Sequence, residues 1–127
     1  MRTNSLLYDR AMDQRLDMLK LALRNLAAPA DEQVQYLDEL LGADAAAHGN
    51  DELAQELNDA FASHLDMRER GFLSEEQIVA IRPVDDLLGR LSGDGAPGFW
   101  KRDALATDDR WEQVRRAAQA ALRKLEP

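Results

Sequence analysis

The chain has 127 residues, with 16 Lys and Arg, 24 Asp and Glu, two His and no Cys, and a net charge of −8. This length predicts a single domain, residues 1–127, with a core of its own. The acidic balance argues against partners that attract cations, namely nucleic acid and anionic membranes. The lack of cysteine excludes disulfides, thiol nucleophiles and thiolate metal sites.

Leu and Ala occur 20 times each, whereas Val, Ile and Thr together occur eight times. Because Ala and Leu favour helices and β-branched residues favour strands, we expect an all-α protein, a single compact bundle-like domain of five or six helices. No run approaches the roughly 18 apolar residues of a membrane span, and charges interrupt the N-terminus before a signal-peptide core. The expected localisation is therefore cytoplasmic.

The first half of the chain predicts three helices. A stripe at helical spacing predicts the first, over about 5–27; its members are Tyr8, Met12, Leu16, Leu19, Leu23 and Leu26. The second covers about 30–41 and stops at Gly42. After a linker, the third is expected from Asn50 or Asp51 to about Arg70.

The second half begins with a capping box, Ser74 three residues before Gln77. It predicts a fourth helix from 74 or 75, which Pro83 should break or kink before a fifth over 84–91. Residues 92–98 are expected to be a loop, and Phe99 to Leu105 an apolar turn or short helix. Thr107 is the expected cap of the last helix.

The acidic charge is concentrated in the middle of the chain, where residues 25–67 hold ten acids and no Lys or Arg. One interpretation is a solvated face that keeps the protein soluble. The other is a negative surface that attracts a basic protein partner and rejects wrong ones. The candidate binding residues are Asp31, Glu32, Asp38, Glu39, Asp44, Asp51, Glu52, Glu56 and Asp59.

Material for catalysis or metal binding is sparse, and we expect no cofactor and no metal. His48 lies four residues after Asp44, but a zinc site needs three or four ligands. His64 lies beside the apolar stripe of the third helix, where it is either a general base or a boundary histidine bonded to the backbone or to a carboxylate. The loop Ser92-Gly93-Asp94-Gly95 fits no phosphate-binding motif.

Two further features have both a structural and a functional interpretation. Trp100 and Trp111 are either core residues or interface anchors. The fourth and fifth helices have the spacing of a helix-turn-helix, but Asp85 and Asp86 on the second of them would repel phosphate.

The C-terminal part, residues 72–127, resembles small uncharacterised bacterial proteins, some of them immunity-type proteins that accompany secreted toxins. The residues that carry the resemblance are Phe72-Leu73-Ser74, Leu87-Leu88, Leu91-Ser92-Gly93, Phe99-Trp100, Ala104-Leu105, Arg110-Trp111, Val114-Arg115, Ala118 and Ala121-Leu122. The resemblance contains no catalytic motif. It implies a cytoplasmic protein, not an enzyme, that binds and blocks one toxin.

The leading hypothesis is therefore a non-enzymatic protein-binding module whose acidic segment, residues 31–66, docks a basic protein, most concretely a toxin. One alternative is a metal- or carboxylate-dependent enzyme that uses His64 and acids such as Asp59 or Asp66. Another is a structural or oligomerising domain, with the Trp-bearing last helix in a dimer interface.

Overall fold

The computed structural model describes residues 2–42, 49–92 and 96–127, and gives the backbone alone for residues 2–9. The described residues form helices and no strands, which confirms the all-α prediction. The helices are α1 (Arg2–Ala27), α2 (Ala30–Leu41), α3 (Asp51–Phe61), α4 (His64–Glu69), α5 (Glu75–Leu91), the 3-10 helix η3 (Pro97–Trp100), α6 (Ala104–Thr107) and α7 (Asp109–Leu125).

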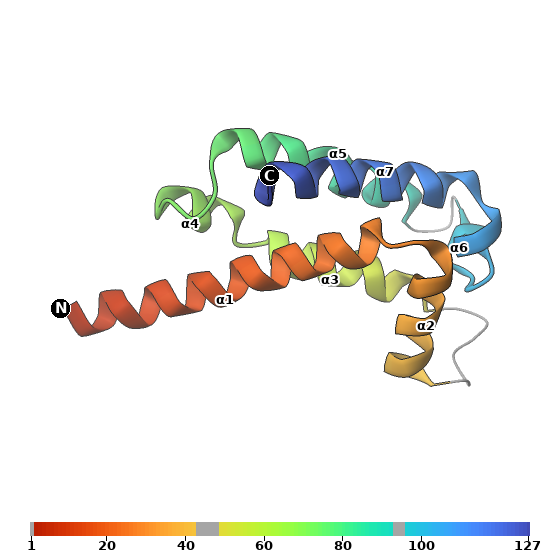
Figure 1. Cartoon of the computed structure of the whole chain (residues 1–127), viewed down its shortest axis with the longest axis horizontal. Coiled ribbons are helices and arrows are strands. Elements are labelled where there is room, and N and C mark those ends of the chain that lie inside the picture. The colour runs from red at the N-terminus through yellow and green to blue at the C-terminus, as the bar shows by residue number, and fades with distance from the viewer. Residues whose placement is uncertain (1, 43–48, 93–95) are drawn as a thin grey trace.

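Four helices, α1, α3, α5 and α7, form two layers (Figure 1). α1 and α3 lie side by side in one layer, α5 and α7 form the other, and α1 also packs against α7. α2 and the short helices η3 and α6 close one end of the molecule, while the N-terminal end of α1 extends beyond α3 at the other (Figure 1). None of the described helices has the length and apolar character needed to cross a bilayer.

The core lies between the two layers. The apolar stripe predicted for α1 is confirmed at Met12, Leu19, Leu23 and Leu26, which are buried, and Leu16 is partly buried. The side chain of Tyr8, the remaining member, lies outside the described part of the structure. The other helices contribute Leu37, Leu53, Leu57, Phe61, Met67, Ile78, Ile81, Val84, Leu88, Phe99, Leu105, Trp111, Val114, Ala118 and Leu125. The described helices therefore share one continuous core.

α2 has the predicted bounds, residues 30–41. It ends at Gly42, whose φ of 79° lies in the left-handed region that glycine occupies without strain. Asp31 and Glu32 lie in its first turn, where carboxylates interact favourably with the helix dipole.

α5 begins as predicted and ends later. The Ser74 side chain accepts a hydrogen bond from the Gln77 backbone N–H, and the Gln77 side chain accepts one from the Ser74 N–H. The predicted break at Pro83 is wrong, because α5 continues to Leu91 as one helix. Pro83 is exposed, and the burial of Val84 and Leu88 beyond it outweighs the lost backbone hydrogen bond. The helix-turn-helix interpretation is therefore wrong, because residues 75–91 form one helix with no turn.

The predicted third helix is divided in two, and this prediction is also corrected. α3 ends at Phe61, and α4 runs from His64 to Glu69. The His64 ring stacks on Phe61 with centroids 4.3 Å apart, and its Nδ1 lies 2.8 Å from the Phe61 carbonyl oxygen. The break between α3 and α4 lets Met67 of α4 enter the core. The single helix predicted from the sequence did not require Met67 to be buried.

The cap of α7 is a further correction. Thr107 ends α6, and Asp108 is the N-cap, whose side chain accepts a hydrogen bond from the Arg110 backbone N–H. The expected apolar turn is confirmed as two short helices, η3 and α6. Of the expected 92–98 loop, residues 93–95 lie outside the described residues.

Candidate protein-binding surface

The structure describes eight of the nine predicted binding acids, and Asp44 lies outside the described residues. They belong to two helices. α2 carries Asp31, Glu32, Asp38 and Glu39, all exposed, and α3 carries Asp51 and Asp59, exposed, and Glu52 and Glu56, partly buried.

Asp38 is neutralised by a cation from another part of the chain. Its carboxylate forms an ion pair with Arg102, which lies between η3 and α6 and whose side chain is only 6% exposed. This contact fastens α2 to the end of the molecule. Asp38 therefore adds less net charge to the surface than the sequence indicates.

Glu56 of α3 is partly buried and links this helix to α1 and α2. Its carboxylate accepts hydrogen bonds from the Tyr36 hydroxyl of α2 and, at 3.3 Å, from the Asn25 amide of α1. Burial, the hydrogen bond to Glu56 and the negative charges of Glu56 and Glu52 raise the pKa of Tyr36 to about 12. Glu56 therefore has a structural role, because its carboxylate is already engaged by Tyr36 and Asn25.

The remaining acids have no cationic partner among the described residues. We call these six residues the unpaired acids: Asp31, Glu32, Glu39, Asp51, Glu52 and Asp59. Within the described ranges, Glu39 accepts a hydrogen bond only from Gln35, and Asp59 only from Gln55. Neither donor carries a charge, so these contacts orient the carboxylates without neutralising them.

Four acids of the second half of the chain are arranged differently, whereas Asp85, Asp86 and Asp109 also have no cationic partner among the described residues. Glu75 pairs with Arg68, and Glu76 with Lys124. Hydrogen bonds from these cations lower the pKa of both carboxyls below the usual range. Asp108 and Glu112 are paired in the same way with arginines of α7. The uneven charge of the sequence thus persists in three dimensions.

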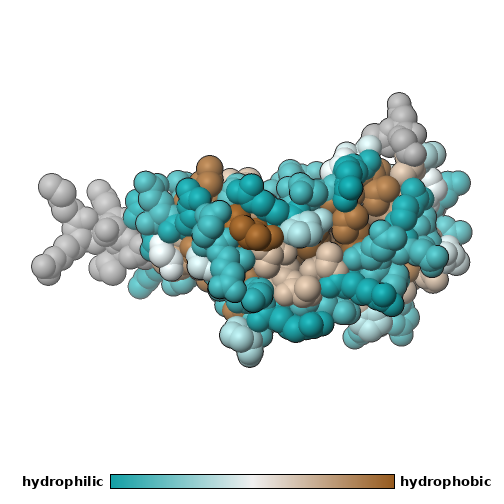
Figure 2. All heavy atoms as spheres, turned by 90° about the horizontal axis from the view of Figure 1, so that it is seen from above, coloured by the Kyte–Doolittle hydropathy of each residue, from teal (hydrophilic) through white to brown (hydrophobic). Residues whose placement is uncertain are grey.

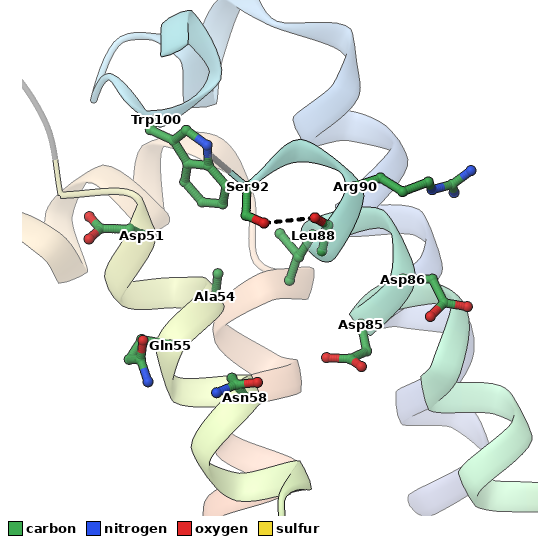
Figure 3. A pocket seen from close by; sticks show the side chains of 11 residues that line it. Asp51, Ala54, Gln55, Asn58, Asp85, Asp86, Leu88, Arg90, Ser92 and Trp100 are labelled. Atoms are coloured by element: carbon green, nitrogen blue, oxygen red, sulfur yellow. Dashed lines mark hydrogen bonds between the residues drawn. The ribbon is translucent and has the colours of Figure 1, made fainter. Parts of the chain in front are cut away.

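A groove of about 1120 Å³ lies between α3 and α5 and ends at Trp100 of η3 (Figure 3). Ala54 and Leu88 line it with apolar surface. Asp85 and Asn58 point into it from the two sides, whereas Asp86 points away from it (Figure 3). Sequence reasoning missed this groove, because its two walls are distant in the chain.

In the described part of the chain, neither histidine forms part of a cluster of catalytic or metal-binding side chains. His64 is engaged with Phe61, and its Nδ1 lies against a backbone oxygen. His48 lies outside the described residues. No three His, Asp or Glu side chains come together there in a metal-binding arrangement.

The two tryptophans have different environments. Trp111 is fully buried, stacks on Phe99 at 4.2 Å and donates its Nε1–H to the Phe99 carbonyl oxygen at 2.7 Å. Trp100 is partly exposed at the groove and donates its Nε1–H to the Leu91 carbonyl oxygen at 2.9 Å. Trp111 is thus a core residue, and Trp100 alone offers a face to a partner.

The side of the molecule formed by α5 and α7 exposes several apolar side chains. Figure 2 shows hydrophobic residues in a broken band along this side, with hydrophilic residues on both borders. α5 leaves Val79 57% exposed and Leu87 and Leu91 partly buried.

Comparisons of the chain with protein-family models, with curated proteins and with solved structures gave no match.

Proposed function

We propose that this protein is a non-enzymatic binding module that docks a basic protein partner through its unpaired acids. One observation carries the proposal: six carboxylates of α2 and α3 have no cationic partner among the described residues, and they lie in a stretch, residues 25–67, that contains no Lys or Arg. By contrast, Glu75, Glu76 and Glu112 are each paired with a cation. A basic surface would supply the missing cations.

The electrostatic argument concerns the rate of encounter as well as affinity. Like charges that remain unpaired repel one another and lower stability slightly, and pairing them internally would remove this cost. An unpaired negative surface instead attracts a positive partner over distances of about 10 Å, the screening length near 0.1 M salt. It also disfavours acidic competitors.

The most concrete form of the proposal is an immunity or antitoxin protein that blocks a toxin in the cytoplasm. It is supported by the resemblance of residues 72–127 and by the same unpaired acids. In this form the protein inhibits by covering the toxin and carries out no chemistry of its own.

The test compares two triple variants of equal charge change. Glu32→Gln/Glu39→Gln/Asp59→Asn neutralises unpaired acids, and Asp13→Asn/Asp17→Asn/Glu69→Gln neutralises exposed acids elsewhere. Each protein is immobilised and exposed to extract of the source cells, and retained proteins are eluted with a salt series.

We expect a basic protein that the wild type and the control retain and the first variant releases at lower salt. With that protein purified, its association rate at low salt should fall about tenfold for the first variant. Equal retention and equal rates for the two variants would contradict the proposal.

A second candidate is self-association through the α5–α7 side, which the exposed apolar Val79 favours. Sedimentation of the wild type and of Val79→Lys over a concentration series decides it. A dimer that the substitution dissociates supports this function, and a monomer at all concentrations removes it.

A further inference from the structure

The groove between α3 and α5 is held open by fixed walls. Asn50, fully buried at the start of α3, donates its side-chain N–H groups to the carbonyl oxygens of Phe99 and Lys101. Trp100 is in turn tied to the last turn of α5 through Leu91. The end wall is therefore bonded to both side walls, and the groove is formed before any partner arrives.

Inside the groove, Asp85 has no balancing charge. Its side chain is partly buried and points toward α3 (Figure 3), and in the described part of the chain it makes no ion pair or hydrogen bond. Arg90 lines the same groove, but its side chain points away on the far side of α5 (Figure 3). A carboxylate beside apolar surface is stabilised when a cation reaches it.

The rest of the lining is suited to apolar side chains. Ala54 and Leu88 line the groove with apolar groups, and Trp100 adds an aromatic surface at one end. Gly89 leaves space in the α5 wall, since a Cβ at this position would meet no atom within 4 Å. The volume, about 1120 Å³, exceeds the roughly 300–1,000 Å³ of small-molecule pockets.

We propose that this groove binds an amphipathic basic helix of the protein partner. One Lys or Arg of that helix reaches Asp85, and its apolar side chains cover Ala54, Leu88 and Trp100. The inference rests on the proposed function and names the segment of the partner that is recognised. Helices commonly dock in this way, with apolar anchors at intervals of three and four residues.

The probe is a synthetic Lys/Leu peptide of about 14 residues, or four helical turns. A Lys/Ser peptide of the same charge controls for general attraction to acid. Binding is followed by heteronuclear NMR, in which the indole N–H signals of Trp100 and Trp111 report separately. The Trp100 signal should shift on addition of the Lys/Leu peptide, and that of buried Trp111 should move much less.

Two substitutions in the groove test the contacts. Asp85→Asn removes the charge and keeps the shape, and Gly89→Phe fills the open space. Each should weaken binding of the Lys/Leu peptide about tenfold, which corresponds to about 1.4 kcal/mol. Asp86→Asn is the matched control on the same helix, and it should change the affinity less than about twofold, because an exposed charge on the rim contributes little.

The outcomes separate this inference from the proposed function. Unchanged peptide binding in Asp85→Asn and Gly89→Phe overturns the groove, and so does equal affinity for the Lys/Ser peptide. An alkylammonium ion that displaces the peptide at similar concentration also overturns it, in favour of a small-molecule site. The groove proposal can fail these tests while neutralisation of Glu32, Glu39 and Asp59 still weakens binding of the natural partner. In that case the proposed function stands.

Discussion

Arg115 joins α7 to two other helices through buried hydrogen bonds, and we predict that Arg115→Ala destabilises the fold strongly. Its side chain is about 10% exposed. Nη1 donates to Gln33 Oε1 at 2.9 Å and to the Leu105 carbonyl oxygen at 3.0 Å, and Nε donates to Glu112. Gln33 in turn donates to the backbone at the end of α1.

The magnitude follows from the two acceptors that would remain buried. A hydrogen bond to a charged donor contributes about 1.5–3 kcal/mol, and a buried acceptor left without a donor costs about 1–3 kcal/mol. Glu112 is half exposed, so water replaces Arg115 there at little cost. For the two acceptors, on Gln33 and Leu105, the sum is about 2–6 kcal/mol, a large part of the 5–15 kcal/mol typical of a domain.

The assay is urea unfolding followed by the fluorescence of the two tryptophans, Trp100 and Trp111. The matched control is Arg116→Ala, which removes a side chain that is 77% exposed and that pairs, among the residues the structure describes, with Glu112 alone. It should cost less than about 0.5 kcal/mol. A cost for Arg115→Ala no larger than for Arg116→Ala would refute this account.

Three smaller predictions concern other contacts. Ser74→Ala removes the capping box with Gln77 and should lower the free energy of unfolding by about 1 kcal/mol, measured by circular dichroism in urea; no change would mean that the cap contributes nothing. Pro83→Ala restores a backbone donor inside α5 and should raise the free energy of unfolding by about 1–2 kcal/mol, whereas a loss would show that the proline suits its position. Tyr36 should ionise near pH 12 in an absorbance titration; its stabilising contribution is complete below pH about 10 and is lost as the pH rises to about 12. Glu56→Gln should bring this ionisation back toward pH 10, and an unchanged value would contradict the assigned cause.

The helices could be predicted where local signals determine them. The bounds of α2 follow from the acids of its first turn and from Gly42, and the start of α5 follows from Ser74 and Gln77. The prediction at Pro83 was wrong because it used only the local preference of proline to end a helix. Burial of α5 on both sides of the proline outweighs that preference. Local preference is outweighed when the apolar face on both sides is buried.

The break between α3 and α4 has no such signal, since neither glycine nor proline lies near Phe61. It depends on where Met67 can reach the core, which is a property of the packed helices. His64 stabilises the break by contacting Phe61.

The candidate surface was predictable in charge and unpredictable in detail. The sequence locates the acids but gives no distance between Asp38 and Arg102, or between Glu56 and Tyr36, which are 64 and 20 residues apart. The groove at Asp85 could not be predicted at all, because it requires two helices that meet only in the folded chain.

The way in which α2 is attached has a consequence for local unfolding. This helix fully buries only Gln33 and Leu37, and its other apolar contacts with the core are made by partly buried residues such as Val34 and Leu41. Polar contacts from Asp38 to Arg102 and from Tyr36 to Glu56 complete its attachment. Segments with few buried apolar groups open at lower free energy than the core. We expect the amides of α2 to exchange with deuterium before those of α5 and α7. The acids of α2 would then adjust their positions against a partner while the four-helix body keeps its shape.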